Sequence, residues 1–287
     1  MTIRHGSFEI TPIVTGTIGL DGGAMFGVVP RPLWEMTNPP DERNRVQLAT
    51  RVLLVRAPSR VYVVDCGTGD KNADRFNDIY KVQHRLAAPE KTPLTAALAE
   101  HGVSPEDVTD VLLTHLHFDH CGGATRYDGD KVVPTFPRAT YHLQEEHWRW
   151  ANQPTERDRA SFIGPDFLPL VEAGQLERLD GPGPVAPGIE AVIVNGHTPG
   201  MQLFKFSDGA GKIVFYAADL WPFTSHVPLP FIMAYDLYPL TTLEDKKRYS
   251  AQAIEEGWRV CFEHDPHCAI GTIESDGKLL KAVCQTT

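Results

Sequence analysis

The chain has 287 residues, 42% of them hydrophobic and 22% charged, a composition typical of a folded globular protein rather than a disordered one. The formal net charge of -10, with no run of basic residues, argues against nucleic-acid binding, which depends on Lys and Arg at phosphates. The apolar runs are far shorter than the roughly 20 residues of a membrane-spanning helix. We therefore expect no membrane or nucleic-acid partner. Because the N-terminus lacks the apolar stretch of a signal peptide, we expect a cytoplasmic protein.

Apolar periodicity and turn residues predict a mixture of strands and helices along the chain. Strands are expected at 8–14, 48–55, 60–64, 108–114, 138–143, 189–194, 203–206, 212–217, 258–262, 268–273 and 279–283. Helices are expected at 74–80, 93–101, 144–150 and 243–257. Ser104-Pro105 predicts one more helix start, and the mixed segment 155–173 could cap a site. We find no repeats, and the Gly-Pro cluster at 181–184 is too short for an interdomain linker, so we expect a single domain over 1–287.

Two Gly- and Pro-rich segments, 19–34 and 220–231, carry more aromatic and Met side chains than a solvated loop would. Such side chains either line a binding site or fold back into the core, and the sequence leaves both open. For the first alternative we predict an apolar pocket wall made of Met25, Phe26, Trp34, Trp221 and Phe231. The five cysteines show no C-x-x-C pair, so free thiols in a reducing compartment are expected. For Cys121 a small packed side chain is favoured over metal contact.

The segment Thr114–His120 has the composition of a metal site, with three histidines and one aspartate directly after an apolar run. His115 and His117 are two residues apart, so on an extended backbone they project to one side and can share one metal. Asp119 and His120 follow where the chain turns and can point to a second metal. The alternative is a histidine-rich solvated loop. Asp65, at the end of an earlier strand, could brace one of these histidines or only form a turn.

Three further predicted strand ends carry a candidate ligand each, namely His197, Asp219 and His264. Imidazole and carboxylate ligands without a thiolate set suit zinc first, with iron, manganese or cobalt as alternatives. Seven such ligands are too many for one closed tetrahedral site and about right for two adjacent divalent metals. Two metals that share a water would lower its pKa from about 15.7 toward 7. This set therefore predicts hydrolysis of a carbonyl or phosphoryl compound by a bridging hydroxide.

The pattern His115-x-His117-x-Asp119-His120, with Gly196–Gly200, Asp219 and a late His264, resembles the metallo-β-lactamase superfamily. The resemblance implies an α+β fold, a four-layer αβ/βα sandwich of two mixed sheets with helices outside. It also implies the ligand sets: the first metal on His115, His117 and His197, the second on Asp119, His120 and His264, and Asp219 as the bridge. Asp65 matches the strand-end acid of that family.

Within the superfamily the chain is most similar to the N-acyl-homoserine lactonase and organophosphorus-hydrolase-like branch. This predicts a hydrolase of a small apolar lactone, ester or phosphotriester, with Asp119 as ligand and proton carrier, and a possible homodimer. That branch commonly has a Tyr soon after the bridging Asp, but here none occurs before Tyr235. His226 is the candidate substitute as donor or acid, unless it is an ordinary loop histidine. The other readings are an iron-dependent sulfur-dioxygenase-type oxidoreductase and a non-catalytic binding protein.

Overall fold

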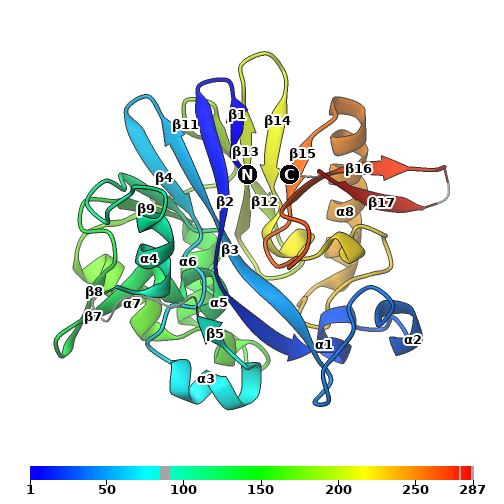
Figure 1. The fold of residues 1–287 in the computed structure, drawn as a ribbon, viewed down its shortest axis with the longest axis horizontal. Helices are drawn as coiled ribbons and strands as arrows, with labels where there is room; N and C mark the ends of the chain where they lie inside the picture. Colours follow the sequence, from blue (N-terminus) through cyan, green and yellow to red (C-terminus); the bar gives the residue numbers. More distant parts are fainter. Residues whose placement is uncertain (85–90, 278, 286–287) are drawn as a thin grey trace. The chain divides into compact units, whose positions relative to one another are not determined.

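The computed structural model describes residues 1–84, 91–277 and 279–285 (Figure 1). Contacts divide the chain into two compact units, each built from two separate stretches. The first unit comprises Met1–Ile18 and Thr50–Asp180, and the second comprises Gly19–Ala49 and Gly181–Thr287. Each unit has its own mixed sheet and helices and is described by itself. The single domain expected over 1–287 stays a prediction.

The first unit is built on a sheet with the strand order β1-β2-β3-β4-β6-β9-β10, in which β5 also pairs with β2. Its strands are β1 (Ile3–His5), β2 (Phe8–Asp21), β3 (Arg45–Ala57), β4 (Arg60–Val64), β5 (Gln83–His84), β6 (Asp110–Leu112), β9 (Thr140–Gln144) and β10 (Leu176–Leu179). β3 and β4 form the expected hairpin, with Ala57 paired to Arg60. β4, β6, β9 and β10 run parallel. Parallel strands are buried on both faces, which explains the continuous apolar runs seen in the sequence.

The helices of the first unit lie between and beside these strands. They are α3 (Ala73–Tyr80), α4 (Pro93–Ala99), α5 (Phe118–Cys121), η1 (Gly122–Ala124), α6 (Glu145–Asn152), η2 (Arg159–Ser161) and α7 (Gly164–Glu172), and a small hairpin of β7 (Thr125–Asp128) and β8 (Lys131–Pro134) is added. One apolar core joins α4, α6 and α7 to the sheet. Within it lies a buried ion pair, Lys71 Nζ to Asp166 Oδ1 at 3.1 Å. Burial raises the pKa of Asp166 to about 6, although Lys71 opposes this.

The second unit has a seven-stranded mixed sheet in the order β11-β12-β13-β14-β15-β16-β17. Its strands are β11 (Gly183–Ala186), β12 (Ile189–Val194), β13 (Met201–Ser207), β14 (Ile213–Tyr216), β15 (Arg259–Cys261), β16 (Ile270–Ser275) and β17 (Leu280–Cys284). Neighbours are antiparallel except β14 and β15, which are parallel. Because β12 is antiparallel to β13 and β13 to β14, the C-terminal ends of β12, β14 and β15 all meet at one edge.

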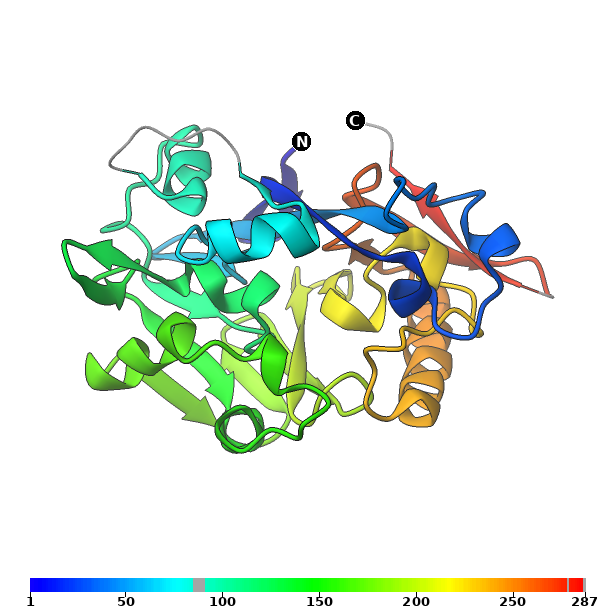
Figure 2. The ribbon, with the colours of Figure 1, turned by 90° about the horizontal axis from the view of Figure 1, so that it is seen from below.

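The helices of the second unit are α1 (Gly22–Phe26), α2 (Arg31–Trp34), η3 (Ala218–Leu220), η4 (Thr224–His226) and α8 (Pro239–Glu256). Figure 2 shows α8, in orange, beside the hairpin of β16 and β17, in red. The buried positions of α8 recur at helical spacing, at Thr242, Lys246, Tyr249, Ser250 and Ala253. Three of these five, Thr242, Lys246 and Ser250, are polar, so the buried face of α8 is not purely apolar.

Some local predictions differ from the structure for identifiable reasons. The helix expected to start at Ser104 is wrong, because residues 105–107 form only a turn. There the Asp107 carboxylate accepts from both the backbone N–H and the hydroxyl of Ser104, which favours a closed turn over a helix. α8 begins four residues earlier than expected, with Pro239 in its first turn, and it ends as expected at Gly257, where φ is +64°.

The prediction that all cysteines are free thiols is wrong for one pair. Cys268 and Cys284, on either side of β16, form a disulfide, whereas Cys66, Cys121 and Cys261 are free and buried. The pairing was not visible in the sequence because it depends on the β16–β17 hairpin, which places Cys284 opposite Gly271. Among the described residues, no helix is long and apolar enough to cross a bilayer.

Candidate metal centre

In the first unit, the buried carboxylate of Asp65 is hydrogen-bonded to Thr114, the residue that precedes the histidine motif. β4 and β6 are parallel neighbours, so the residues that follow them, Asp65 and Thr114, emerge at the same edge of the sheet. Thr114 donates to Asp65 twice, from its backbone N–H to Oδ1 at 2.8 Å and from its hydroxyl to Oδ2 at 2.7 Å. The backbone of Asp65 has φ +54°, a conformation that costs a non-glycine residue about 1–3 kcal/mol. Such strain is retained where the surrounding contacts over-determine the position, as these do.

Asp65 also orients one predicted ligand. Its Oδ2 lies 3.2 Å from Nδ1 of His120, so it can accept the Nδ1 hydrogen and leave Nε2 as the nitrogen that binds a metal. The structure therefore supports the bracing role of Asp65 over a turn-forming role alone. His120 and Asp119 lie on the short helix α5, with His120 Nε2 and Asp119 Oδ2 3.9 Å apart.

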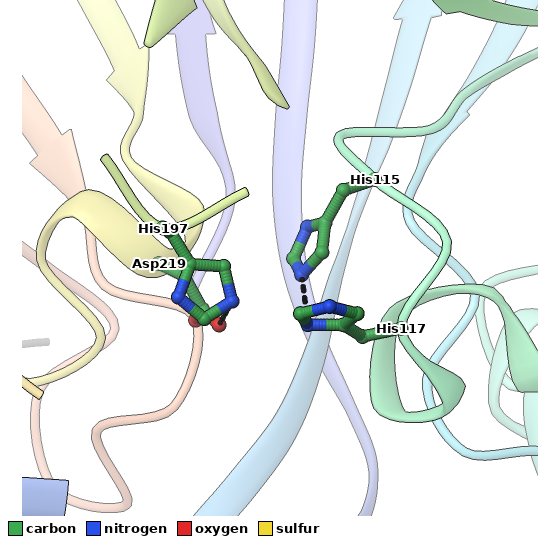
Figure 3. Close-up of side chains that lie close together, drawn as sticks. All are labelled: His115, His117, His197 and Asp219. Atoms are coloured by element: carbon green, nitrogen blue, oxygen red, sulfur yellow. Dashed lines mark hydrogen bonds and ion pairs between the residues drawn. The ribbon is translucent and has the colours of Figure 1, made fainter. Parts of the chain in front are cut away.

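His115 and His117 bring two ring nitrogens together, as the two-residue spacing predicts. The Thr114 hydroxyl already donates to Asp65, so it accepts from His115 Nδ1 at 3.0 Å, and Nε2 becomes the metal-binding nitrogen. That Nε2 lies 3.1 Å from His117 Nδ1 (Figure 3). Two nitrogens bound to one tetrahedral zinc at 2.0–2.1 Å are about 3.3 Å apart. The pair is thus spaced for a single ion.

His147 is a residue whose contact with the histidine motif the sequence analysis missed. It is fully buried on α6. Its Nε2 accepts the backbone N–H of Leu116, between the two histidines, at 2.8 Å. His147 thereby fixes the backbone from which His115 and His117 project. His142, by contrast, bonds Asp110 inside the sheet.

The second unit brings its three predicted ligands to one sheet edge. His197, Asp219 and His264 each come three residues after the last residue of β12, β14 and β15. Asp219 Oδ2 lies 3.1 Å from His197 Nε2, an ion pair shown in Figure 3, and Asp219 Oδ1 lies 3.2 Å from His264 Nε2. Each carboxylate oxygen therefore faces a different imidazole. A carboxylate placed in this way can bridge two metals, each held by one of the histidines.

The far nitrogens of both histidines have their own acceptors. His264 Nδ1 donates to the carbonyl of Ala49 at 2.9 Å. His197 Nδ1 donates to Asp236 at 2.9 Å, and the second oxygen of Asp236 accepts from the Thr242 hydroxyl at 2.8 Å. These bonds commit Nδ1 in both rings and direct Nε2 toward Asp219. Asp236 is a second residue that the sequence analysis missed, since no motif links it to a histidine 39 positions away.

The backbone around His197 and Asp219 is closely constrained. Gly196 lies against Thr242 so tightly that a Cβ at position 196 would overlap the Thr242 backbone, which explains the glycine before His197. Ala218, before Asp219, has φ +40°. Burial lowers the pKa of His197, but Asp219 and Asp236 together raise it to about 10. A metal at Nε2 would therefore displace the proton that faces Asp219, while the Nδ1 hydrogen stays bonded to Asp236.

The donor types and spacings fit the metals predicted from the sequence. All seven predicted ligands are buried: His115, His117, Asp119, His120, His197, Asp219 and His264. Among the described residues, buried His and Asp side chains gather in clusters consistent with a dinuclear metal site. Cys121 does not belong to these clusters. Its thiol is fully buried, which raises its pKa well above 9, and it donates to the carbonyl of Leu116 at 3.4 Å.

Of the predicted pocket residues, Phe26, Trp34 and Phe231 belong to one aromatic cluster inside the second unit. Met25, Phe26, Trp34 and Trp221 are all at most 2% exposed, and only Phe231 is half-buried. Phe26 stacks on Trp34 with ring centroids 5.1 Å apart. Four of the five are thus core positions, the alternative that the sequence left open. That these residues form a pocket wall stays a prediction, and Phe231 is the member whose side chain is partly exposed.

His226 lies in the same cluster. Its ring stacks on Phe26, with centroids 4.8 Å apart, and its Nε2 donates to the carbonyl of Met25 at 2.8 Å. Burial lowers the pKa of His226 to about 3, so the ring is neutral near pH 7. Its Nδ1 has no hydrogen-bond partner among the described residues. In this arrangement Nδ1 can accept a hydrogen bond from a ligand, whereas the N–H on Nε2 is already bonded to Met25.

Comparison with known proteins gives one family match. The family described as the metallo-beta-lactamase superfamily matches residues 46–248. An N-acyl homoserine lactonase of Bacillus cereus is 26% identical over 130 residues, 45% of this chain and 45% of that protein. The chain thus spans less than half the length of the first curated relatives it matches. A probable metallo-hydrolase of Mycobacterium tuberculosis is 25% identical over 277 residues, 86% of this chain and 83% of that protein.

Two solved structures resemble the fold over nearly its whole length. A probable metal-dependent hydrolase from Staphylococcus aureus has a TM-score of 0.87 and 26% identity, and the match covers 99% of each chain. AidC, a dizinc quorum-quenching lactonase in complex with a homoserine product, has a TM-score of 0.80 and 20% identity, over 100% of this chain and 97% of that one. The predicted fold class, with two mixed sheets and helices, is confirmed.

Proposed function

Because the chain belongs to the metallo-β-lactamase superfamily of hydrolases, we propose that it uses two divalent metal ions to hydrolyse a small apolar lactone, ester or phosphotriester. The observation that carries the dinuclear part is Asp219, whose two oxygens face His197 and His264 at 3.1 and 3.2 Å. A site for one metal ion would not need the two oxygens of one carboxylate to face different histidines. The dizinc lactonase of similar fold supports zinc as the metal, with iron, manganese or cobalt as alternatives.

The proposed ligand sets follow the family pattern. By that pattern, His115, His117 and His197 would hold the first ion, Asp119, His120 and His264 would hold the second, and Asp219 would be a ligand of both. When bound, such a pair lowers the pKa of water and polarises the oxygen of the bond to be broken. The chain's own residues then supply orientation: Asp65, Asp236 and the Ala49 carbonyl fix three of the rings.

Two side chains are proposed to act on the substrate. Asp119, at the first turn of α5, is proposed as a ligand that also carries a proton to the leaving group. His226 is proposed to contact the substrate in the place that a tyrosine takes in related lactonases. Since the one N–H of the neutral ring, on Nε2, is bonded to the Met25 carbonyl, His226 can only accept from a substrate donor at Nδ1 and cannot donate to a substrate carbonyl.

The substrate class rests on similarity to N-acyl homoserine lactonases and on the apolar side chains around Phe231. The test is metal analysis followed by a panel of acyl lactones, aryl esters and phosphotriesters. We expect about two metals per chain, hydrolysis of at least one class, and loss of that activity on chelation and in His117→Ala. Uniform inactivity with both metals bound would overturn the substrate class, and oxygen uptake instead of hydrolysis would indicate the dioxygenase alternative. The homodimer and the cytoplasmic location stay predictions.

A further inference from the structure

Lys246 on α8 is a fully buried lysine whose ammonium group is hydrogen-bonded to three backbone carbonyls. Its Nζ donates to Pro228 O at 2.8 Å, to Leu229 O at 3.2 Å and to Phe231 O at 2.7 Å. Lysine is almost never fully buried unless its charge is satisfied. Burial lowers the pKa of Lys246 to about 7, and the nearby Asp236 opposes this shift. The site is thus built for an ammonium group, which has three donors for the three acceptors.

The three acceptors belong to one turn. The N–H of Phe231 donates to Pro228 O at 3.1 Å and closes the four-residue turn 228–231. Pro228 and Pro230 have no N–H to contribute. Three of the four carbonyls in this turn converge on Lys246 and so hold it against α8. Without the ammonium all three oxygens would lose this buried donor, although Pro228 O would keep the N–H of Phe231.

The turn 228–231 also carries Phe231, one member of the aromatic cluster. Phe231 packs edge-on against Phe26, with ring centroids 6.2 Å apart at 89°. His226 precedes the turn by two residues and stacks on the ring of Phe26 in the same cluster. Both Phe231 and His226 are proposed above to meet the substrate. Their positions therefore depend on a turn fixed by a side chain from another element.

We propose that Lys246 is a positioning residue for substrate binding, which holds the turn 228–231 and with it Phe231 and His226. The claim that Lys246 affects substrate binding rests on the function proposed above. Thr242 lies one helical turn earlier on the same face of α8 and bonds Asp236, which orients His197. One face of α8 thus fixes both a metal ligand and the substrate turn, through two separate polar contacts.

The test compares Lys246→Met with Lys247→Met, a matched control whose lysine is 48% exposed and forms an ion pair with Glu244. Hydrogen exchange is followed in the peptide that covers 227–238, where the amides of Phe231 and Ala234 are hydrogen-bonded. We expect exchange there to quicken at least about tenfold in the Lys246 variant only, because buried acceptors lose their donor. KM should rise about tenfold, with kcat within about threefold and the metal content unchanged.

Unchanged exchange in Lys246→Met would overturn the proposal, and so would faster exchange with an unchanged KM. If Lys246→Met does not fold, Lys246→Gln, which keeps two donors, is expected to give an intermediate rate. A rate equal to that of the unsubstituted protein would count against the proposal. If the unsubstituted protein hydrolyses nothing on the panel, the proposed function fails, and the exchange measurement alone still decides whether Lys246 holds the turn.

Discussion

Substitution of Asp236 tests how far this carboxylate supports metal binding by orienting His197. In Asp236→Asn the amide oxygen can still accept from His197 Nδ1, but the negative charge that favours this ring orientation is lost. In Asp236→Ala the 2.9 Å bond to His197 and the 2.8 Å bond from Thr242 are both removed. Loss of a partner of this kind typically costs 10–100-fold in metal affinity. We expect about tenfold for the amide and about 100-fold for the alanine, or roughly 1.4 and 2.7 kcal/mol.

The assay is competition for zinc with a chromophoric chelator, combined with metal analysis of the purified variants. Because His197 is a proposed ligand of one ion only, one of the two sites should weaken while the other keeps its affinity. Thr242→Ser retains the hydroxyl that bonds Asp236 and serves as the matched control, whereas Thr242→Val should weaken the same site by less than Asp236→Ala. A folded Asp236→Ala protein that binds two ions as tightly as the unsubstituted chain would refute this reasoning.

Three further predictions concern stability. The pKa of Asp166 is raised from 3.8 to about 6, so the folded state holds its proton more tightly than the unfolded state, and its contribution to stability is lost as pH rises through this window. Between pH 4 and 7 the protein should therefore lose roughly 2 kcal/mol relative to Asp166→Asn in urea titrations; a difference independent of pH would contradict this. In Gly122→Ala the new Cβ would overlap the backbone carbonyl of Thr68, so we expect the free energy of unfolding to fall by roughly 3 kcal/mol. Thermal unfolding measures this, and an unchanged melting temperature would contradict it. Cys268→Ser should cost roughly 3 kcal/mol by opening a loop of 16 residues to Cys284, and a reductant should then affect only the unsubstituted protein.

The proposed metal ligands could be named from the sequence because each is encoded locally. His115, His197, Asp219 and His264 follow short apolar runs that form strands, and the change from strand to loop is visible in the sequence. The residues that orient these ligands were not predictable. Asp236 lies 39 residues from His197, and His147 lies 31 residues from the amide it accepts from. Nothing in their own neighbourhoods distinguishes them from ordinary polar positions.

Other errors arose where one local signal has two physical outcomes. Ser104-Pro105 is typical of a helix start, but the Asp107 side chain captures the Ser104 amide and closes a turn instead. An aromatic residue in a Gly-rich segment can face a ligand or the core, and for Phe26 and Trp34 the ring stacking that decides this depends on tertiary packing. Polar residues on a helix are normally solvated, yet Lys246 is buried because a turn 15 to 18 residues away supplies its acceptors.

The interleaved course of the chain constrains how synthesis on the ribosome can proceed. The first unit has all of its residues once position 180 has been made, because it needs only Met1–Ile18 and Thr50–Asp180. The stretch Gly19–Ala49 belongs to the second unit and must wait for residues 181–287. During that interval Phe26 and Trp34 lack Phe223 and His226, against which Phe26 packs in the folded protein. Exposed aromatic surface of this kind attracts chaperones, so the nascent chain is most vulnerable to aggregation while its second half is being translated.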